Sequence, residues 1–315
     1  MIQLKDVQAG RERISKFIKH TPLNFSEYFS KINSNHVYLK LENLQITNAF
    51  KVRGASNYIL QIGPYVGKRG VITASSGNHG KAVAYVSSQI GYPAKVVVPT
   101  DAPLSKVKSI KDYGAKVIYW KKFTKERDEK AQQLAKEHQL TFIDSVDHPW
   151  IIQGQGTVGL EIIEDLPDVD AVLVPIGGGG LISGISIAIK EKNPKVKIYG
   201  VEPIGSNSMS LSLQAGKITE LKNINTIADG LRSNQPGSLA FTIVKKYVDD
   251  IILVTEEEIR LALKALLLED KLLAEPSGVV SLAAILAGKA PFKDKKVAVV
   301  ISGGNVDFEN IKKYV

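Results

Sequence analysis

The chain has 315 residues, 44% of them hydrophobic and 23% charged, which suits a globular protein with one or two domains. The formal net charge is +9, but the densest basic cluster, between Lys121 and Lys136, is interleaved with acidic residues. That interleaving is typical of a solvated helix face, so we expect no nucleic-acid partner. Because the chain has no cysteine, disulfides, thiolate zinc sites and cysteine nucleophiles are excluded.

The start of the chain and its apolar runs bear on membranes and export. Residues 1–6 lack the apolar core of a signal peptide. No apolar run approaches the ~18 residues that a spanning helix needs. We therefore expect a soluble, cytoplasmic protein with no membrane partner.

The first half of the chain predicts a parallel sheet. A helix over 7–18 and a strand over 37–41 come first, and a helix-like run follows Lys51. From residue 71 onward, short apolar runs alternate with longer amphipathic ones. We predict strands over 71–74, 95–98, 116–119 and 141–143, and helices over 78–89, 105–113 and 124–138. This alternation indicates parallel strands joined by helical crossovers.

A second α/β unit follows. We predict strands over 172–175, 197–201, 251–254 and 297–301, and helices over 181–192, 256–268 and 278–286. No linker separates the N-terminal segment from the rest, so we expect it to pack with the C-terminal unit. The predicted division is a large domain of residues 1–69 and 148–315 and a small inserted α/β domain of residues 70–147.

Four consecutive glycines follow the predicted strand 172–175 and open a helix: Gly177, Gly178, Gly179 and Gly180. Backbone N–H groups there can approach a phosphate closely, and the helix dipole favours an anion. A plain tight turn is the alternative, but four glycines carry a large cost in conformational entropy. Two nucleotide-binding motifs are not matched. The dinucleotide motif G-x-G-x-x-G is completed in no register, although Glu202 ends the next predicted strand, where that motif's ribose-binding acid would lie. Residues 63–69 do not match the Walker pattern.

A second loop also joins a strand to a helix. It contains Ser75, Ser76, Gly77, Asn78 and His79, whose hydroxyl and backbone N–H groups suit an anion, although Ser76 or Asn78 could simply cap the helix. A third polar loop, residues 302–305, follows the strand 297–301, at the edge where open α/β sheets bind ligands. Together with Lys51, these loops predict a covalently held, phosphorylated cofactor.

The ordered set of motifs resembles the serine/threonine dehydratase and serine racemase family, pyridoxal phosphate enzymes of the tryptophan synthase β-like fold (fold type II), which is an α/β fold of two domains with parallel sheets flanked by helices. The resemblance spans nearly the whole chain. It is carried by residues 40–45, 50–55, 75–80, 154–157, 177–181, 228–230, 275–276 and 302–305.

The resemblance implies a role for each motif. Lys51 would carry pyridoxal 5'-phosphate as a Schiff base, with Phe50 beside the pyridine ring. The phosphate would lie at Gly177, Gly178, Gly179, Gly180 and Leu181. Asn78 would bind the ring hydroxyl, Ser302 would face the pyridine nitrogen, and Glu275 and Gly303 would complete the cofactor site. The loop of Ser75, Ser76, Gly77, Asn78 and His79 would hold the substrate carboxylate.

The activity we expect from the resemblance is that of an L-threonine/L-serine ammonia-lyase, with Lys51 as the base at Cα and 2-oxobutyrate or pyruvate plus ammonia as products. A serine racemase with lyase side activity is an alternative, because racemases have a serine at Ser76 and racemisation needs a second proton carrier. Residues 146–149 favour the dehydratase. A 3-hydroxyaspartate ammonia-lyase and a non-catalytic ligand-binding protein are further alternatives.

Three departures from the family pattern bear on function. Asn48 and Ala49 replace the usual Gly-Ser before Phe50. This replacement could alter the substrate pocket and therefore the preference for threonine. The family's divalent-cation site uses a glutamate matching Glu202 and an acid where this chain has Ser208, so magnesium or calcium binding through Glu202 is a hypothesis. The sequence ends soon after the last motif, so we expect no regulatory domain and no isoleucine feedback. The family resemblance also predicts a homodimer.

Overall fold

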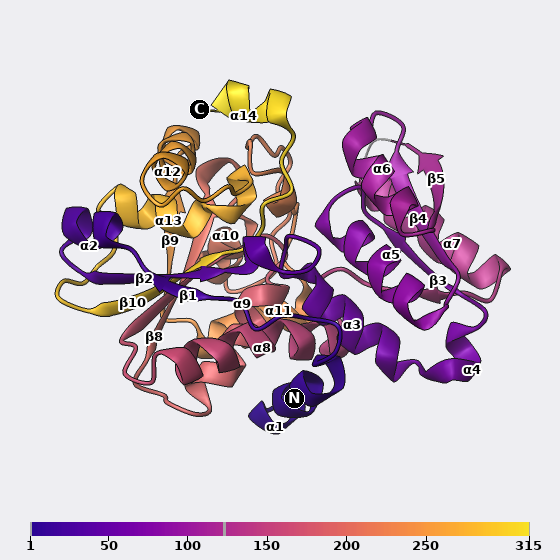
Figure 1. Cartoon of the computed structure of the whole chain (residues 1–315), viewed down its shortest axis with the longest axis horizontal. Helices are drawn as coiled ribbons and strands as arrows, with labels where there is room; N and C mark the ends of the chain where they lie inside the picture. Colours follow the sequence, from indigo (N-terminus) through magenta and orange to yellow (C-terminus); the bar gives the residue numbers. More distant parts are fainter. Residues whose placement is uncertain (1, 122–123, 315) are drawn as a thin grey trace.

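The computed structural model describes residues 2–121 and 124–314, so Lys122 of the basic segment lies outside the described residues. Two β-sheets, each with its own helices, lie side by side (Figure 1). The six-stranded sheet has the order β1 (Leu23–Phe25), β2 (His36–Leu41), β10 (Lys296–Ile301), β7 (Ala171–Pro175), β8 (Lys197–Pro203) and β9 (Asp250–Val254). The four-stranded sheet has the order β5 (Lys116–Trp120), β4 (Ala94–Pro99), β3 (Val71–Ala74) and β6 (Thr141–Phe142).

Both sheets are built from parallel strands. The four-stranded sheet is parallel throughout, as the alternating pattern predicted. In the larger sheet the described pairings are parallel except that of β1 with β2. Val299 of β10 lies between Leu39 of β2 and Leu173 of β7. Central strands of this kind are covered on both faces, which explains the continuous apolar run of β7 and of Val297–Ile301 in β10.

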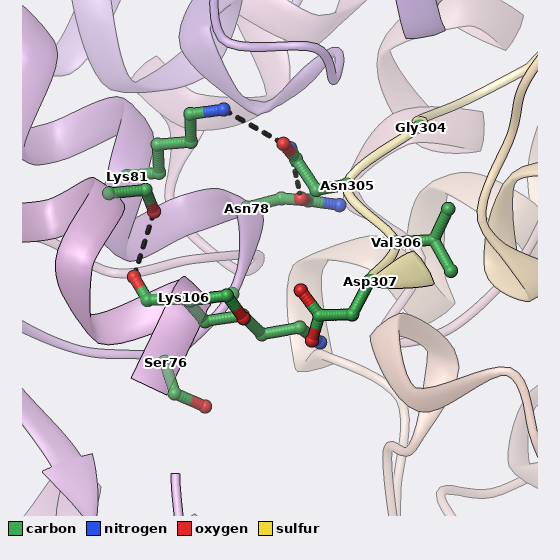
Figure 2. Close-up of a pocket in the computed structure, with 11 residues that line it drawn as sticks. Ser76, Asn78, Lys81, Lys106, Gly304, Asn305, Val306 and Asp307 are labelled. Carbon is green, nitrogen blue, oxygen red and sulfur yellow. Dashed lines mark hydrogen bonds between the residues drawn. The ribbon is translucent and has the colours of Figure 1, made fainter. Parts of the chain in front are cut away.

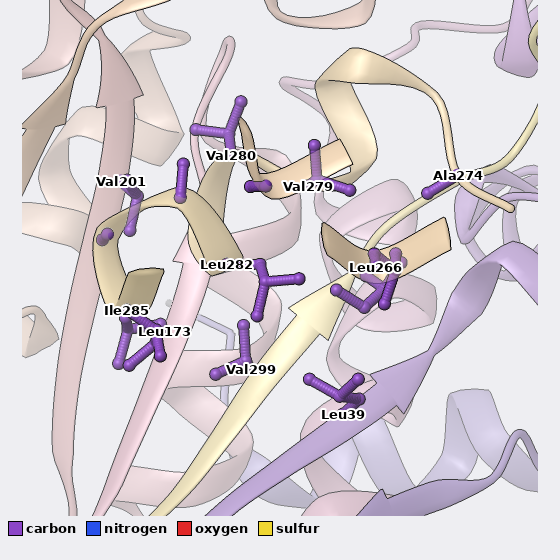
Figure 3. Packing of buried hydrophobic residues seen from close by; sticks show 14 of the residues in the cluster. Leu39, Leu173, Val201, Leu266, Ala274, Val279, Val280, Leu282, Ile285 and Val299 are labelled. Atoms are coloured by element: carbon purple, nitrogen blue, oxygen red, sulfur yellow. The ribbon is translucent and has the colours of Figure 1, made fainter. Parts of the chain in front are cut away.

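Helices cover both faces of the six-stranded sheet. Leu173 and Val299 point to one face and pack with α2 (Glu27–Asn33), α12 (Glu256–Leu268) and α13 (Val280–Leu286). Figure 3 shows them near Leu266 of α12 and Leu282 of α13. Val172 and Val300 point to the other face, towards α8 (Pro149–Asp165), α9 (Gly180–Lys190) and α11 (Ser238–Tyr247). The alternation of side chains along each strand therefore divides one sheet between two cores.

The four-stranded sheet is also covered on both faces. Val96 packs with α5 (Asn78–Ile90) and α6 (Leu104–Asp112), and Val97 packs with α7 (Thr124–Glu137). Helix α3 (Lys51–Gln61) shares the core of Val96 and also packs against α8. The strands of this sheet all come from residues 71–142. The division into domains at 70–147 stays a prediction, and α3 packs on both sides of it.

Several elements were not predicted. The longest is α8, whose sequence is rich in glycine and therefore has a low helix propensity. Close packing compensates: a Cβ on Gly154 would lie 2.4 Å from the carbonyl oxygen of Arg53, and one on Gly184 would lie 2.4 Å from the backbone nitrogen of Gly156. The helices α3, α8 and α9 thus meet backbone to backbone through glycines.

The remaining elements are short or lie at the periphery. They are α1 (Leu4–Ile14), α4 (Gly63–Gly67), α10 (Ser208–Ala215) and α14 (Phe308–Tyr314), with the 3-10 helices η1 (Glu42–Leu44), η2 (Ile204–Ser206), η3 (Asp229–Leu231) and η4 (Pro276–Gly278). Among the described helices, none combines the length and the apolar character that crossing a bilayer requires.

A buried charge cluster joins α3, η1, β2 and α8. The guanidinium of Arg53 donates to Glu42 at 2.8 Å and to Glu161 at 2.7 Å. The ammonium of Lys40 lies 2.7 Å from Glu161 and donates to the carbonyl oxygen of Thr21. Arg53, Lys40 and Glu42 are fully buried. Since Arg53 is two residues from Lys51, this cluster fixes the start of α3.

We predict that Arg53→Met lowers the free energy of unfolding by about 3–5 kcal/mol, because it leaves buried carboxylates without their partner. Urea unfolding of the protein without added ligand measures the change. Arg11→Gln is the control: its partner Glu164 is more than a third exposed, so the loss should stay below about 1 kcal/mol. Equal losses in the two variants would contradict the prediction.

Candidate active site

Lys51 begins α3 and lies against the segment that leaves the small sheet. Its ammonium donates to the carbonyl oxygen of Ser145 at 2.7 Å and lies 5.3 Å from the ring centre of Phe50. Burial lowers the pKa of Lys51 from 10.5 to about 8, and the charge of Asp144 opposes part of this shift. A lysine with this pKa is a fair nucleophile and base near neutral pH.

Residues 144–147 connect Lys51 to the glycine loop. While Ser145 accepts from Lys51, its neighbour Val146 packs against that loop: a Cβ on Gly178 would lie 2.7 Å from the Val146 side chain, and one on Gly180 would lie 2.7 Å from the Val146 carbonyl oxygen. Asp144 accepts from the N–H groups of Val146 and of the next residue at 2.6 and 2.7 Å, which holds the turn. The sequence analysis assigned no role to Asp144 or Ser145.

The glycine loop presents free backbone donors. Among the described residues, the N–H groups of residues 177–181 donate no hydrogen bond. Gly179 has a φ of 96°, which favours glycine, and Gly180 begins α9. Leu181 is buried in the first turn of that helix. Unpaired N–H groups at a helix start suit an anionic oxygen, so this loop fits a phosphate.

The second loop ends at a cavity of about 140 Å³, shown in Figure 2. Ser76, Gly77 and Asn78 line it, and Ser75 accepts from the Gly77 N–H behind them. His79 does not line the cavity. It is buried, one ring nitrogen lies 3.3 Å from the carbonyl oxygen of Ile143, and burial, with the charge of Lys51, lowers its pKa to about 3. The ring is therefore neutral, and its role in substrate binding stays a prediction.

A chain of amide hydrogen bonds crosses the cavity from α5 to the loop after β10. Asn78 donates to Glu275 at 2.5 Å and accepts from Asn305 at 2.7 Å, and Lys81 donates to Asn305 at 2.8 Å. Figure 2 shows the last two contacts. Burial, with the charge of Asp229, raises the pKa of Glu275 to about 7. Lys81 was missed in the sequence, although it lies three residues after Asn78 on the same helix.

The loop after β10 holds the residues just before Lys51. The N–H of Phe50 donates to the carbonyl oxygen of Ser302 at 3.1 Å, and Ala49 forms a bridge with Gly303. Glu275 donates its N–H to Gly303 at 3.0 Å. Ser302 is buried, with its hydroxyl 3.4 Å from the carbonyl oxygen of Ser277. The structure therefore brings Ser302, Gly303 and Glu275 to the start of α3.

The backbone conformation of Asn48 explains how asparagine can replace the glycine that is usual in the family at this position. Its φ is 59°, in the left-handed region that asparagine tolerates better than most residues. The backbone can therefore keep a conformation suited to the glycine usual at this position. The side chain of Asn48 also accepts from Lys81 at 3.1 Å, which ties this loop to α5.

Glu202 lies near the end of β8, next to the start of α10. Its buried carboxylate accepts from the N–H groups of Met209 and Ser210. Burial raises its pKa to about 8, and these two hydrogen bonds oppose the shift. Within residues 2–121 and 124–314, no group of three or more His, Cys, Asp or Glu side chains is arranged to hold a metal ion.

The chain is similar in sequence and in structure to known proteins. A family model described as pyridoxal-phosphate dependent enzyme matches residues 14–303. An L-threonine ammonia-lyase of Thermotoga maritima is 44% identical over 315 residues, which is 100% of this chain and 78% of that protein. A catabolic L-threonine dehydratase of Staphylococcus aureus is 42% identical over 315 residues, which is 99% of this chain and 91% of that protein. The structure of maize serine racemase is similar with a TM-score of 0.95 and 37% identity, covering 99% of this chain and 96% of that one.

We predict that Lys51 reacts with the aldehyde of pyridoxal phosphate with a pH midpoint near 8, because its pKa is lowered from 10.5 to about 8 and its unprotonated amine is therefore abundant at a lower pH than that of an ordinary lysine. Borohydride trapping at a series of pH values, followed by peptide mass spectrometry, measures the initial labelling rate. Peptides with surface lysines provide the internal control. Labelling of Lys51 no faster than theirs at pH 8 would contradict the prediction.

Proposed function

The chain belongs to the pyridoxal-phosphate dependent enzyme family, and from that premise we propose that it is an L-threonine/L-serine ammonia-lyase. The observation that carries the proposal is 42–44% identity to L-threonine ammonia-lyases and dehydratases across nearly all of the chain. The partly buried Lys51, with its lowered pKa, supports an active enzyme over a ligand-binding protein that has lost the chemistry.

The residues fit the cofactor. The free N–H groups of residues 177–181 would hold its phosphate, and Lys51 would hold its aldehyde carbon. Ser302 would face the pyridine nitrogen, and Asn78, oriented by Glu275, would face the ring hydroxyl. Pyridoxal phosphate bound there would supply an electron sink for the pair left on the substrate Cα. A hydroxyl such as that of Ser302 is too weak an acid to protonate the ring nitrogen fully, which restrains that sink.

The side chains divide the proposed reaction between them. The N–H and hydroxyl groups around Ser76 would bind the substrate carboxylate beside the cavity. Lys51, once displaced by the substrate amine, would take the Cα proton. The β-hydroxyl then leaves with a proton as water. Addition of water to the released imine gives ammonia with 2-oxobutyrate from threonine or pyruvate from serine.

Serine racemisation is the second candidate, and Ser76 is the residue that favours it. Racemisation needs a second group that delivers a proton to the opposite face of Cα, and the Ser76 side chain borders the cavity. The likeness to maize serine racemase supports this activity as an accompaniment to elimination. 3-Hydroxyaspartate also has a β-hydroxyl, and an electropositive pocket could accept its second carboxylate, so it stays a third substrate to test.

The assembly and the compartment are also proposals. We propose a homodimer, supported by exposed apolar side chains on β1 and α2: Phe25, Tyr28 and Ile32 are 46, 37 and 45% exposed. Light scattering of the purified protein tests it. We propose the cytoplasm as the compartment.

We predict that the purified protein with pyridoxal phosphate forms oxo acid from L-threonine or L-serine faster than D-serine from L-serine. L-threonine, L-serine and L-threo-3-hydroxyaspartate are incubated separately, and oxo acid and D-enantiomer are measured in the same samples. Lys51→Ala should lose turnover and the visible absorbance of the bound cofactor. No oxo acid from any of the three substrates would overturn the ammonia-lyase.

We predict that Ser76→Ala lowers racemisation of L-serine by about 100-fold, the usual contribution of one acid/base group, while elimination changes much less. The ratio of D-serine to pyruvate measures the effect independently of enzyme concentration. Ser109→Ala, which changes another serine at the same cavity, is the matched control and should leave the ratio unchanged. A parallel loss of both products in Ser76→Ala would assign Ser76 to binding alone.

A further inference from the structure

Glu202 accepts hydrogen bonds from N–H groups in the first turn of α10. It lies near the end of β8, its side chain is fully buried, and its two oxygens accept from the N–H of Met209 at 3.0 Å and of Ser210 at 2.9 Å. The first N–H groups of a helix have no partner within the helix, so acceptor oxygens placed there pair groups that would otherwise stay buried without a hydrogen bond. Glu202 thereby fixes α10 against the end of β8.

Helix α10 and the turn before it contact the glycine loop. Met209 is fully buried, and a Cβ on Gly179 would lie 2.7 Å from its terminal methyl carbon. In η2, the Ser206 hydroxyl donates to the carbonyl oxygen of Leu231 at 2.9 Å. Leu231 packs at the other end of the loop, where a Cβ on Gly177 would lie 3.1 Å from its Cα. The segment that Glu202 anchors therefore supports the proposed phosphate site at both ends.

The oxygen atoms around Glu202 do not form a ligand set for the divalent cation that the family resemblance suggested. A hard cation such as calcium takes six to eight oxygens, several of them anionic. Here the one carboxylate has both oxygens engaged by N–H groups. The position where the family has an acid is Ser208, whose buried hydroxyl has no hydrogen-bond partner in the described part of the chain. The helix start is thus satisfied by Glu202 itself.

We infer that Glu202 is a positioning residue that holds α10 and, through Met209, the phosphate loop at Gly179, without a divalent cation. The inference rests on the proposed function only in taking the ligand of that loop to be the cofactor phosphate. It makes cofactor retention in this enzyme independent of magnesium and calcium. It also makes Ser208 the position at which an acid would convert the helix start into a cation site.

The first test is the thermal midpoint of the cofactor-free protein with EDTA, magnesium or calcium, which needs no enzymatic activity. The wild type is expected to melt at the same temperature in all three, and Ser208→Asp is expected to gain a midpoint that rises with calcium. Metal analysis after dialysis accompanies the melts. A wild type that retains metal or is stabilised by it overturns the inference, and so does a Ser208→Asp variant that stays insensitive.

The second test is cofactor affinity. Glu202→Gln keeps the shape of the side chain but replaces one acceptor by an N–H donor, so it should weaken pyridoxal phosphate binding by about tenfold. The dissociation constant is measured by fluorescence titration of the cofactor-free protein, and the KM for the amino acid should change little. Glu220→Gln, an exposed glutamate that accepts from Asn234, is the matched control and should leave binding unchanged.

The two tests separate the inference from the proposed function. Unchanged cofactor affinity in a folded Glu202→Gln variant overturns the positioning role, while the activity of the wild type stands. If the wild type binds no pyridoxal phosphate at all, the proposed function fails. The cation dependence of the melting temperature would still decide whether Glu202 is a metal ligand.

Discussion

The buried pairing of Arg53 with two carboxylates is the interaction on which the site depends. It holds the first turn of α3 to η1 through Glu42 and to α8 through Glu161. Taking these charges out of water is costly, so the cluster is stable only when all of its members are in place. That condition makes it a constraint on geometry more than a source of stability. Because Lys51 lies two residues before Arg53 in the same turn, the position of its amine follows from the position of this cluster.

Two strand-to-helix loops, one on each sheet, are the proposed anion sites of the protein. One precedes α5 on the small sheet and the other precedes α9 on the large sheet, and both present helix N-termini. Between them runs the segment after β6, whose Ser145 contacts Lys51 and whose Val146 packs on the glycines. Free N–H groups at a helix start favour an anion, so both loops suit a phosphorylated ligand. The lowered pKa of Lys51 has a separate cause, which is its burial among these elements.

Much of the fold and of the site could be predicted from the sequence because it depends on local patterns, such as the spacing of apolar residues and short loop motifs. Strand 71–74 and helix 256–268 were predicted with the bounds they have, since their apolar spacing matches their structure. Helix α8 was missed because its glycines lower its intrinsic propensity and its stability comes from packing on α3 and α9. The contacts of Lys81 and Ser145 were missed for a related reason: each joins residues more than 90 positions apart, and no local pattern records such a pairing.

The hydrogen bonds across the cavity connect binding to the relative position of the two sheets. Asn78, on α5, contacts Glu275 and Asn305, which belong to the half of the chain that carries the large sheet. Lys106 of α6 also forms an ion pair with Asp229, which lies in the half of the chain that carries the large sheet. Lys81 of α5 adds two contacts across the same boundary, to Asn305 and to Asn48, so any movement of the small sheet would break or re-form this set. A substrate carboxylate at the start of α5 would bind beside Asn78 and add one more contact to the same set. Under the proposed function, closure around the substrate and orientation of Asn78 towards the cofactor ring would be one event, and the site would exclude water as it became competent for proton transfer.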